Sequence, residues 1–289
     1  MPGRDRAMIT VMSTLSAPPD HRALFRAVIT LGVVSQVAQI VVLRDLLMVC
    51  HGNELSIGLI LAAWMIWVGV GSRLGAILGE RCPWTHVPLS LTTVGTVITL
   101  PLSLYAVRAL RGWISVLPGA HPPIDTMALA CLIILAPIGL LLGAHFVLLA
   151  RAWGRPEDGL STAGGNRTYM AEATGNAVGG AIFSLILVHV LDAFQIAALA
   201  GTLLLITSTW LLGSGQRRWL LQILLGSAVI GLLVMDLEDR SWRQHWQRFA
   251  PEHRLVSTHQ SKHGTIAEPV VGSWSRRAQR RCCSRSPVL

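Results

Sequence analysis

Seven long apolar runs constrain this chain more than any other feature of its sequence. An α-helix needs about 20 mostly apolar residues to cross a bilayer, because the hydrocarbon core is about 30 Å thick. The runs that meet this requirement are approximately 23–49, 55–79, 87–108, 126–150, 168–190, 193–213 and 217–236. The sequence therefore predicts an all-α fold, a polytopic transmembrane helix bundle of about seven spans over residues 23–236.

The composition agrees with burial in lipid. Hydrophobic residues make up 52% of the chain and charged residues only 13%, whereas soluble domains carry about 25% charged residues. The formal charge of +9 is concentrated in the segment from Arg240 to the end, which holds ten basic residues and two acids. A basic tail beside membrane spans indicates attraction to anionic lipid or control of topology. No nucleic-acid-binding motif accompanies it, so the lipid bilayer is the predicted partner and nucleic acid is not.

The arginines predict an orientation. Cytoplasmic connections carry an excess of Lys and Arg, and four arginines precede or open the first span, at Arg4, Arg6, Arg22 and Arg26. We therefore expect a protein of the bacterial inner membrane with residues 1–22 in the cytoplasm. Seven spans would then place the basic tail outside. The sequence leaves open whether one span is miscounted or the tail is translocated.

Motifs for soluble chemistry are missing from the sequence. The five cysteines form no CxxC or Cys/His ligand spacing, so no metal site or disulfide framework is predicted. No phosphate-binding loop or nucleophile elbow occurs either. We predict no catalytic residue in this chain.

Polar side chains at membrane depth are the remaining candidates for function, because they usually face the bundle interior or water. Arg44, Asp45 and Glu54 flank the first predicted hairpin. Arg44 is within reach of Glu54 across the turn; alternatively Arg44 extends to the interface and both acids lie in water.

Glu172 opens the fifth run and is either an interfacial acid or part of a polar site that faces the bundle. His145, near the end of the fourth run, is expected near the same membrane face and so within reach of Glu172. A haem shared with His189 is disfavoured, because antiparallel neighbours place the two histidines near opposite faces. Tyr169 completes the candidate intramembrane polar site of Glu172, Tyr169, His145, Arg44, Asp45 and Glu54.

Glycines spaced four apart predict close helix packing, since small residues let two helices approach each other in lipid. The predicted packing glycines are Gly71, Gly75, Gly79, Gly139, Gly143, Gly175, Gly179 and Gly180.

Beyond residue 236 the sequence changes character. Residues 237–253 are polar and suit an interfacial linker, and residues 254–267 alternate like a strand, a turn and a strand. Residues 268–289 show no periodicity and are predicted to form an irregular basic tail.

Three stretches together resemble a known family. "VVLRDLLMVCHGNELSIGLILAAWMIWVGVGS" (41–72) resembles the first helical hairpin of the membrane-integral spermidine-synthase-like proteins. "YMAEATGNAVGG" (169–180) resembles a glutamate- and glycine-containing helix of that family, and "RLVSTHQSKHGTIA" (254–267) the β-hairpin that opens its aminopropyltransferase domain. The resemblance extends over most of 23–267.

This resemblance implies a membrane module followed by a domain that binds decarboxylated S-adenosylmethionine and a polyamine. Residues 268–289 are too few for such a domain, since one βαβ unit takes about 30 residues. We therefore expect no cofactor in this chain, a truncated catalytic domain at 254–267, and no transferase activity from the chain alone. Either 268–289 is read out of frame, or it is a genuine short tail.

Two further classes of function stay open. The first is a small transporter of a cationic solute, with Glu172, Glu54 and Asp45 along its path. An acid suits a polyamine through charge-assisted hydrogen bonds to ammonium groups. The second is a structural protein that binds itself or another membrane chain through its glycine faces.

Overall fold

The structure is a computed structural model. It describes residues 21–49, 54–81, 86–114, 123–154, 162–212, 216–234, 240–243, 253–261 and 264–271. Its helices are α2 (His21–Val49), α3 (Glu54–Arg81), α4 (His86–Ile114), α5 (Ile124–Trp153), α6 (Thr162–Ile182), α7 (Val188–Val190), α8 (Ala193–Leu212) and α9 (Gln216–Val234). A π-helical stretch, η2 (Phe183–Leu187), joins α6 to α7.

Long apolar helices dominate the described chain, as the sequence predicts. Six segments are long and apolar enough to cross a membrane: 21–49, 54–81, 87–110, 124–153, 165–190 and 193–211. Such helices are compatible with an integral membrane protein in a lipid bilayer. The seventh predicted run corresponds to α9, which is not among these six.

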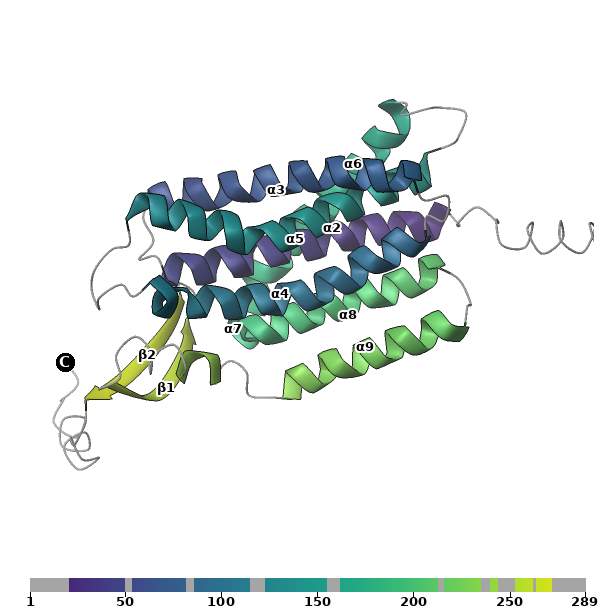
Figure 1. The fold of residues 1–289 in the computed structure, drawn as a ribbon. Coiled ribbons are helices and arrows are strands. Elements are labelled where there is room, and N and C mark those ends of the chain that lie inside the picture. The colour runs from purple at the N-terminus through teal and green to yellow at the C-terminus, as the bar shows by residue number, and fades with distance from the viewer. Residues whose placement is uncertain are drawn as a thin grey trace, which may run out of the picture.

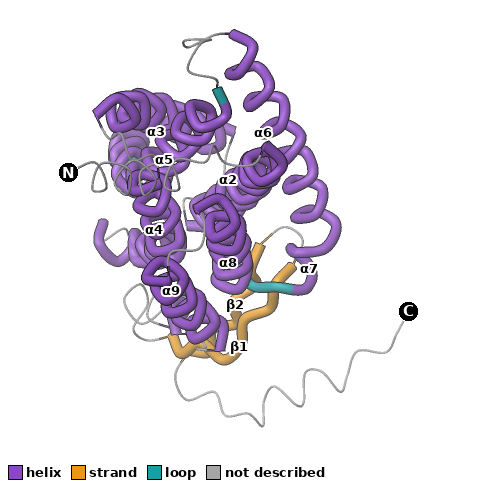
Figure 2. The backbone as a smooth tube through the Cα atoms, turned by 90° about the vertical axis from the view of Figure 1, so that its right-hand side faces the viewer, coloured by secondary structure: helices purple, strands orange, loops and turns teal. Residues whose placement is uncertain are grey.

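Helix α2 occupies the middle of the bundle. It contacts α3, α4, α5, α6 and α8, and Figure 2 shows these helices arranged around it, with α6 on the outside. Helix α3 packs mainly against α5, and α9 packs against α8. Figure 1 shows the long helices running side by side along one direction.

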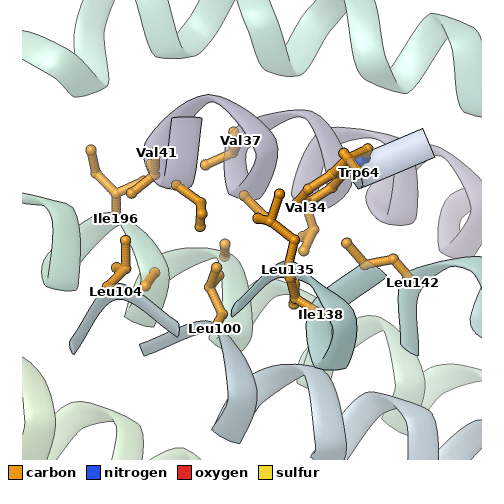
Figure 3. Close-up of a cluster of buried hydrophobic side chains, with 14 of the residues drawn as sticks. Val34, Val37, Val41, Trp64, Leu100, Leu104, Leu135, Ile138, Leu142 and Ile196 are labelled. Carbon is orange, nitrogen blue, oxygen red and sulfur yellow. The ribbon is translucent and has the colours of Figure 1, made fainter. Parts of the chain in front are cut away.

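Apolar side chains from α2, α3, α4, α5 and α8 meet in the core of the bundle. Figure 3 shows Val34, Val37, Val41, Trp64, Leu100, Leu104, Leu135, Ile138, Leu142 and Ile196 in this core. Helices in lipid gain no hydrophobic free energy from one another, so van der Waals contact between such side chains stabilises their association. The outward faces carry exposed hydrophobic residues such as Met65, Leu91 and Leu185, which suits contact with lipid tails.

The helix pair α3 and α5 is held together at backbone distance. A Cβ atom at Gly71 would collide with the backbone of Leu140, and one at Gly143 would collide with the backbone of Val68. Gly75 and Gly139 lie in the same seam, and a Cβ at Gly79 would instead meet the Arg151 side chain. The glycine spacing in these two helices therefore sets how closely they approach.

A second glycine seam joins α2 to α6. A Cβ atom at Gly32 would collide with the backbone of Glu172, and one at Gly175 with the backbone of Ile29. A Cβ at Gly179 would come within 2.8 Å of the Val33 Cα atom. A Cβ at Gly180, by contrast, would meet only the Gln36 side chain, at 3.6 Å. Glycine is required by close approach at the first three positions and not at the fourth.

Two antiparallel strands, β1 (His253–Ser261) and β2 (Gly264–Val271), form a hairpin with an irregularity between Leu255 and Ser257. The hairpin backbone lies against α2 and α7. It sits at the end of the bundle opposite the start of α2 (Figure 1). Strand β2 continues four residues beyond Ala267, to Val271, so the first residues of the predicted irregular tail are paired in the hairpin. Residues 272–289 lie outside the described residues.

Candidate functional site

A buried ion pair lies at the hairpin end of the bundle. The Nε atom of Arg108 on α4 donates a hydrogen bond to Oδ2 of Asp45 on α2 at 2.9 Å. Arg108 is 1% exposed and Asp45 is 3% exposed. Helices α2 and α4 run in the same direction, so residues near their C-terminal ends reach the same level. The burial of each charge depends on the presence of the other, because a buried charge without a counter-charge strongly destabilises the fold.

Two aromatic rings flank the same guanidinium group. The Cζ atom of Arg108 lies 4.9 Å from the ring centroid of Phe194 and 4.9 Å from that of Trp242. At this distance the negative faces of the rings attract the cation, and the attraction is strongest where water is excluded. Phe194 belongs to the first turn of α8, and Trp242 to a helical segment at 240–243 that follows α9 in the chain.

Ser241 ties this segment to the bundle. Nη1 of Arg108 donates a hydrogen bond to Oγ of Ser241 at 2.7 Å, and Ser241 and Trp242 are both buried. Asp45, Arg108, Phe194, Ser241 and Trp242 are hereafter called the Arg108 cluster. The cluster connects α2, α4 and α8 to the segment that precedes the hairpin, with one cation at its centre.

The sequence left Asp45 either in water or in the candidate intramembrane polar site, and Arg108 was not a candidate. Asp45 is buried and binds Arg108, so the expectation that Asp45 lies in water is wrong. Glu54 is exposed at the start of α3, and no ion pair joins it to Arg44 within the described residues. The sequence did contain a signal for this pair. Asp45 lies near the end of the first predicted run and Arg108 at the end of the third, and because these two spans are parallel, their ends lie near the same membrane face.

His145 is buried on α5 and is bound to α4 rather than to Glu172. Its Nδ1 atom lies 2.7 Å from Oγ1 of Thr92, and that oxygen is 3.0 Å from the carbonyl oxygens of Pro88 and Leu89. If the single hydroxyl proton is directed to the helix backbone, the hydroxyl oxygen accepts a hydrogen bond from Nδ1–H. His145 therefore links α5 to α4 by a side-chain hydrogen bond, and the expected contact with Glu172 is not formed in the described structure.

The other candidates lie on α6. Glu172 is partly buried beside the α2–α6 seam, and Tyr169 is 64% exposed. The candidate polar site predicted from sequence thus divides into separate places: Asp45 in the Arg108 cluster, His145 on α4–α5, and Glu172 on α6. No group of three or more His, Cys, Asp or Glu side chains suited to a metal ion occurs in the described part of the chain.

Comparisons of this chain with protein-family models, with curated proteins and with solved structures found no match.

Proposed function

We propose that this chain is a membrane module that carries an extramembrane domain at one end of its bundle, and that β1 and β2 are the beginning of that domain. The resemblance of 41–72, 169–180 and 254–267 to spermidine-synthase-like proteins suggests an aminopropyltransferase-like domain. In this proposal the helices present the domain and perform no chemistry.

The Arg108 cluster is the observation that carries the proposal. A hairpin that merely followed the last helix would need no fixed attachment, whereas Ser241 and Trp242 are buried against a cation held by Asp45. Charge-assisted hydrogen bonds and flanking rings give such an attachment a defined geometry. The domain that begins at β1 would therefore be held in a fixed position above the bundle.

In this proposal α9 is the seventh span. Val229 of α9 packs with Val97, Ala198 and Leu205 of the neighbouring helices, and the hairpin lies at the end of the bundle opposite the start of α2. Apart from the basic tail, the arginines of the helix ends and short connections are more numerous at the other end, at Arg22, Arg26, Arg73, Arg81, Arg151, Arg167, Arg217 and Arg218, than at the hairpin end, at Arg44, Arg108 and Arg111. Counted over these short connections, the positive-inside rule favours a cytoplasmic start of α2 and a hairpin outside.

Reporter fusions test the topology. Fusions after Leu212 and after Val271 each carry either green fluorescent protein, which is fluorescent inside the cell, or alkaline phosphatase, which is active outside. We expect fluorescence from the first position and phosphatase activity from the second. Fluorescence at both positions would eliminate α9 as a span.

The coding DNA tests the identity of the domain. Translation in all three frames from the codon of Ala267 should reveal a continuation of the hairpin into a glycine-rich nucleotide loop and acidic motifs. If no frame encodes such a continuation, the hairpin does not open an aminopropyltransferase domain, and this part of the proposal is wrong.

Transport of a cationic solute is less well supported. Asp45 already binds Arg108, and Glu54 is exposed at the start of α3. The three acids therefore do not line a single path for a solute through the bundle. A transporter should lose uptake in the Glu172→Gln variant while the protein stays folded, whereas the membrane-module proposal predicts unchanged uptake.

A further inference from the structure

One flank of α6 carries polar side chains that the bundle leaves without partners. The Oδ1 atom of Asn176 is buried and accepts no hydrogen bond within the described residues. Glu172 lies one helical turn earlier and is partly buried, and no hydrogen bond or ion pair of its carboxylate occurs there either. Residues four apart on a helix are neighbours on one face, so the carboxylate and the amide share one flank.

Gln36 of α2 borders the same flank. Its Cγ atom would lie 3.6 Å from a Cβ atom at Gly180, one turn beyond Asn176. Helical side chains lean toward the N-terminus of their helix. Because α2 and α6 run in the same direction, we expect the Gln36 amide to lie nearer the level of Asn176 than its Cγ atom does. The structure shows no hydrogen bond of Gln36 within its described part. Glu172, Asn176 and Gln36 are hereafter called the α6 flank.

The depth of this flank makes the missing partners significant. The span runs from residue 165 to residue 190, so Asn176 lies near its middle and Glu172 about one turn nearer its start. No water is available in the hydrocarbon region to satisfy an open acceptor. Polar and ionisable side chains at such depth commonly mark a binding site or a pathway. The glycine seam already holds α2 and α6 together, so the polar groups are not needed for packing.

We propose that the α6 flank binds the primary ammonium group of an aliphatic amine. An ammonium group has three N–H donors, which match one carboxylate and two amide carbonyl groups. A hard metal ion is a poorer match, because calcium, for example, takes six to eight oxygen ligands. The site lies on the membrane-embedded part of the bundle and does not depend on the proposed role of the hairpin.

The amine could come from solution or from an ethanolamine lipid, and the experiment separates the two. The full chain is reconstituted in bilayer discs of phosphatidylcholine, whose quaternary headgroup has no N–H donor. Butylammonium chloride is the probe, and the midpoint of thermal unfolding is measured against its concentration. Tetramethylammonium, which has the same charge and no N–H donor, is the control ligand. The titration is repeated in discs that also contain phosphatidylethanolamine.

We expect a saturable rise in the midpoint with butylammonium and none with tetramethylammonium. Glu172→Gln should raise the half-saturating concentration at least tenfold, whereas the exposed-acid control Glu54→Gln should not change it. Asn176→Ala should weaken binding, and Asn176→Asp, which keeps an acceptor, should bind at least as well as the wild type. A higher half-saturating concentration in ethanolamine discs assigns the lipid as the occupant, and an unchanged one assigns a soluble amine.

Three results would overturn the proposal: no saturable response in the wild type, an equal response to tetramethylammonium, or equal binding by wild type and Glu172→Gln. The Asn176→Asp variant keeps the test decisive if Asn176→Ala fails to fold.

Discussion

The Arg108 cluster and the α6 flank are two polar regions of the same bundle with opposite construction. In the first, opposite charges meet at 2.9 Å between two helices, and rings from two further segments enclose the cation. In the second, Glu172 and Asn176 lie along one helix, and the amide oxygen is buried with no hydrogen bond in the described structure. In the Arg108 cluster the polar groups bind one another and join segments of the chain. In the α6 flank the polar groups remain available to bind a ligand.

The difference follows from what holds each region together. At the α2–α6 seam, backbone contact at Gly32, Gly175 and Gly179 already brings the helices together. At the hairpin end, the segment at 240–243 has no comparable glycine seam in the described chain, and its buried residues gather around Arg108. Polar groups at membrane depth therefore have a structural role where backbone packing is absent and become candidates for binding where it is present.

The largest effect should come from Arg108→Leu. The substitution leaves the Asp45 carboxylate buried without its counter-charge, which should lower the free energy of unfolding by about 3–5 kcal/mol. Titration with a denaturing detergent in micelles measures this quantity. The double variant Asp45→Leu with Arg108→Leu should recover much of the loss, because an apolar pair of similar volume is tolerated. Wild-type stability in Arg108→Leu would mean that the ion pair has no structural role.

The next largest effect is expected for Ser241→Ala. It removes a hydrogen bond to a charged group, which contributes about 1.5–3 kcal/mol. The loss should also loosen the segment before the hairpin, so limited proteolysis between 243 and 253 should become faster. If the cleavage rate stays unchanged while stability falls, Ser241 stabilises the bundle without positioning the hairpin.

Glycine substitution tests the second region. Gly175→Ala would force the added methyl group against the backbone of Ile29, and overpacking of this kind costs about 1–3 kcal/mol. Gly180→Ala is the matched control on the same helix, since its methyl group would meet only the Gln36 side chain at 3.6 Å. Equal stability of the two variants would show that close approach does not hold this seam.

The smallest effect on stability should come from Glu172→Gln. Its carboxylate has no partner in the described chain, so neutralising it should leave the free energy of unfolding within about 0.5 kcal/mol of the wild type, or raise it. The same detergent titration used for Arg108→Leu gives the direct contrast. A loss of several kcal/mol would reveal a structural pairing and place the α6 flank in the same class as the Arg108 cluster.

The helical bundle could be predicted from sequence because membrane spans are local features. Each needs about 20 apolar residues in a row, and nothing distant is required to recognise them. The glycine seam between α3 and α5 could be predicted for a related reason. Gly71 and Gly75 on one helix, and Gly139 and Gly143 on the other, are each four residues apart and so lie on one face of their helix.

The Arg108 cluster could not be assembled from sequence, because its members come from four segments. Arg108 is the last residue of the third predicted run, and Ser241 and Trp242 lie in the predicted interfacial linker. The contact between Asp45 and Arg108 depends on two spans running in parallel at matching depth. Asn176 was not predicted for a different reason. What distinguishes it is a buried amide oxygen that accepts no hydrogen bond in the described structure, and a sequence pattern cannot show that a hydrogen bond is absent.

The pairing of Asp45 with Arg108 also sets an order of events during synthesis. Asp45 leaves the ribosome 63 residues before its counter-charge, and Ser241 follows Arg108 by a further 133 residues. A first span that carries an unpaired acid enters lipid less favourably than an apolar one. The early helices should therefore remain beside the insertion machinery until the third span arrives, and the cluster closes only after α9 has been made.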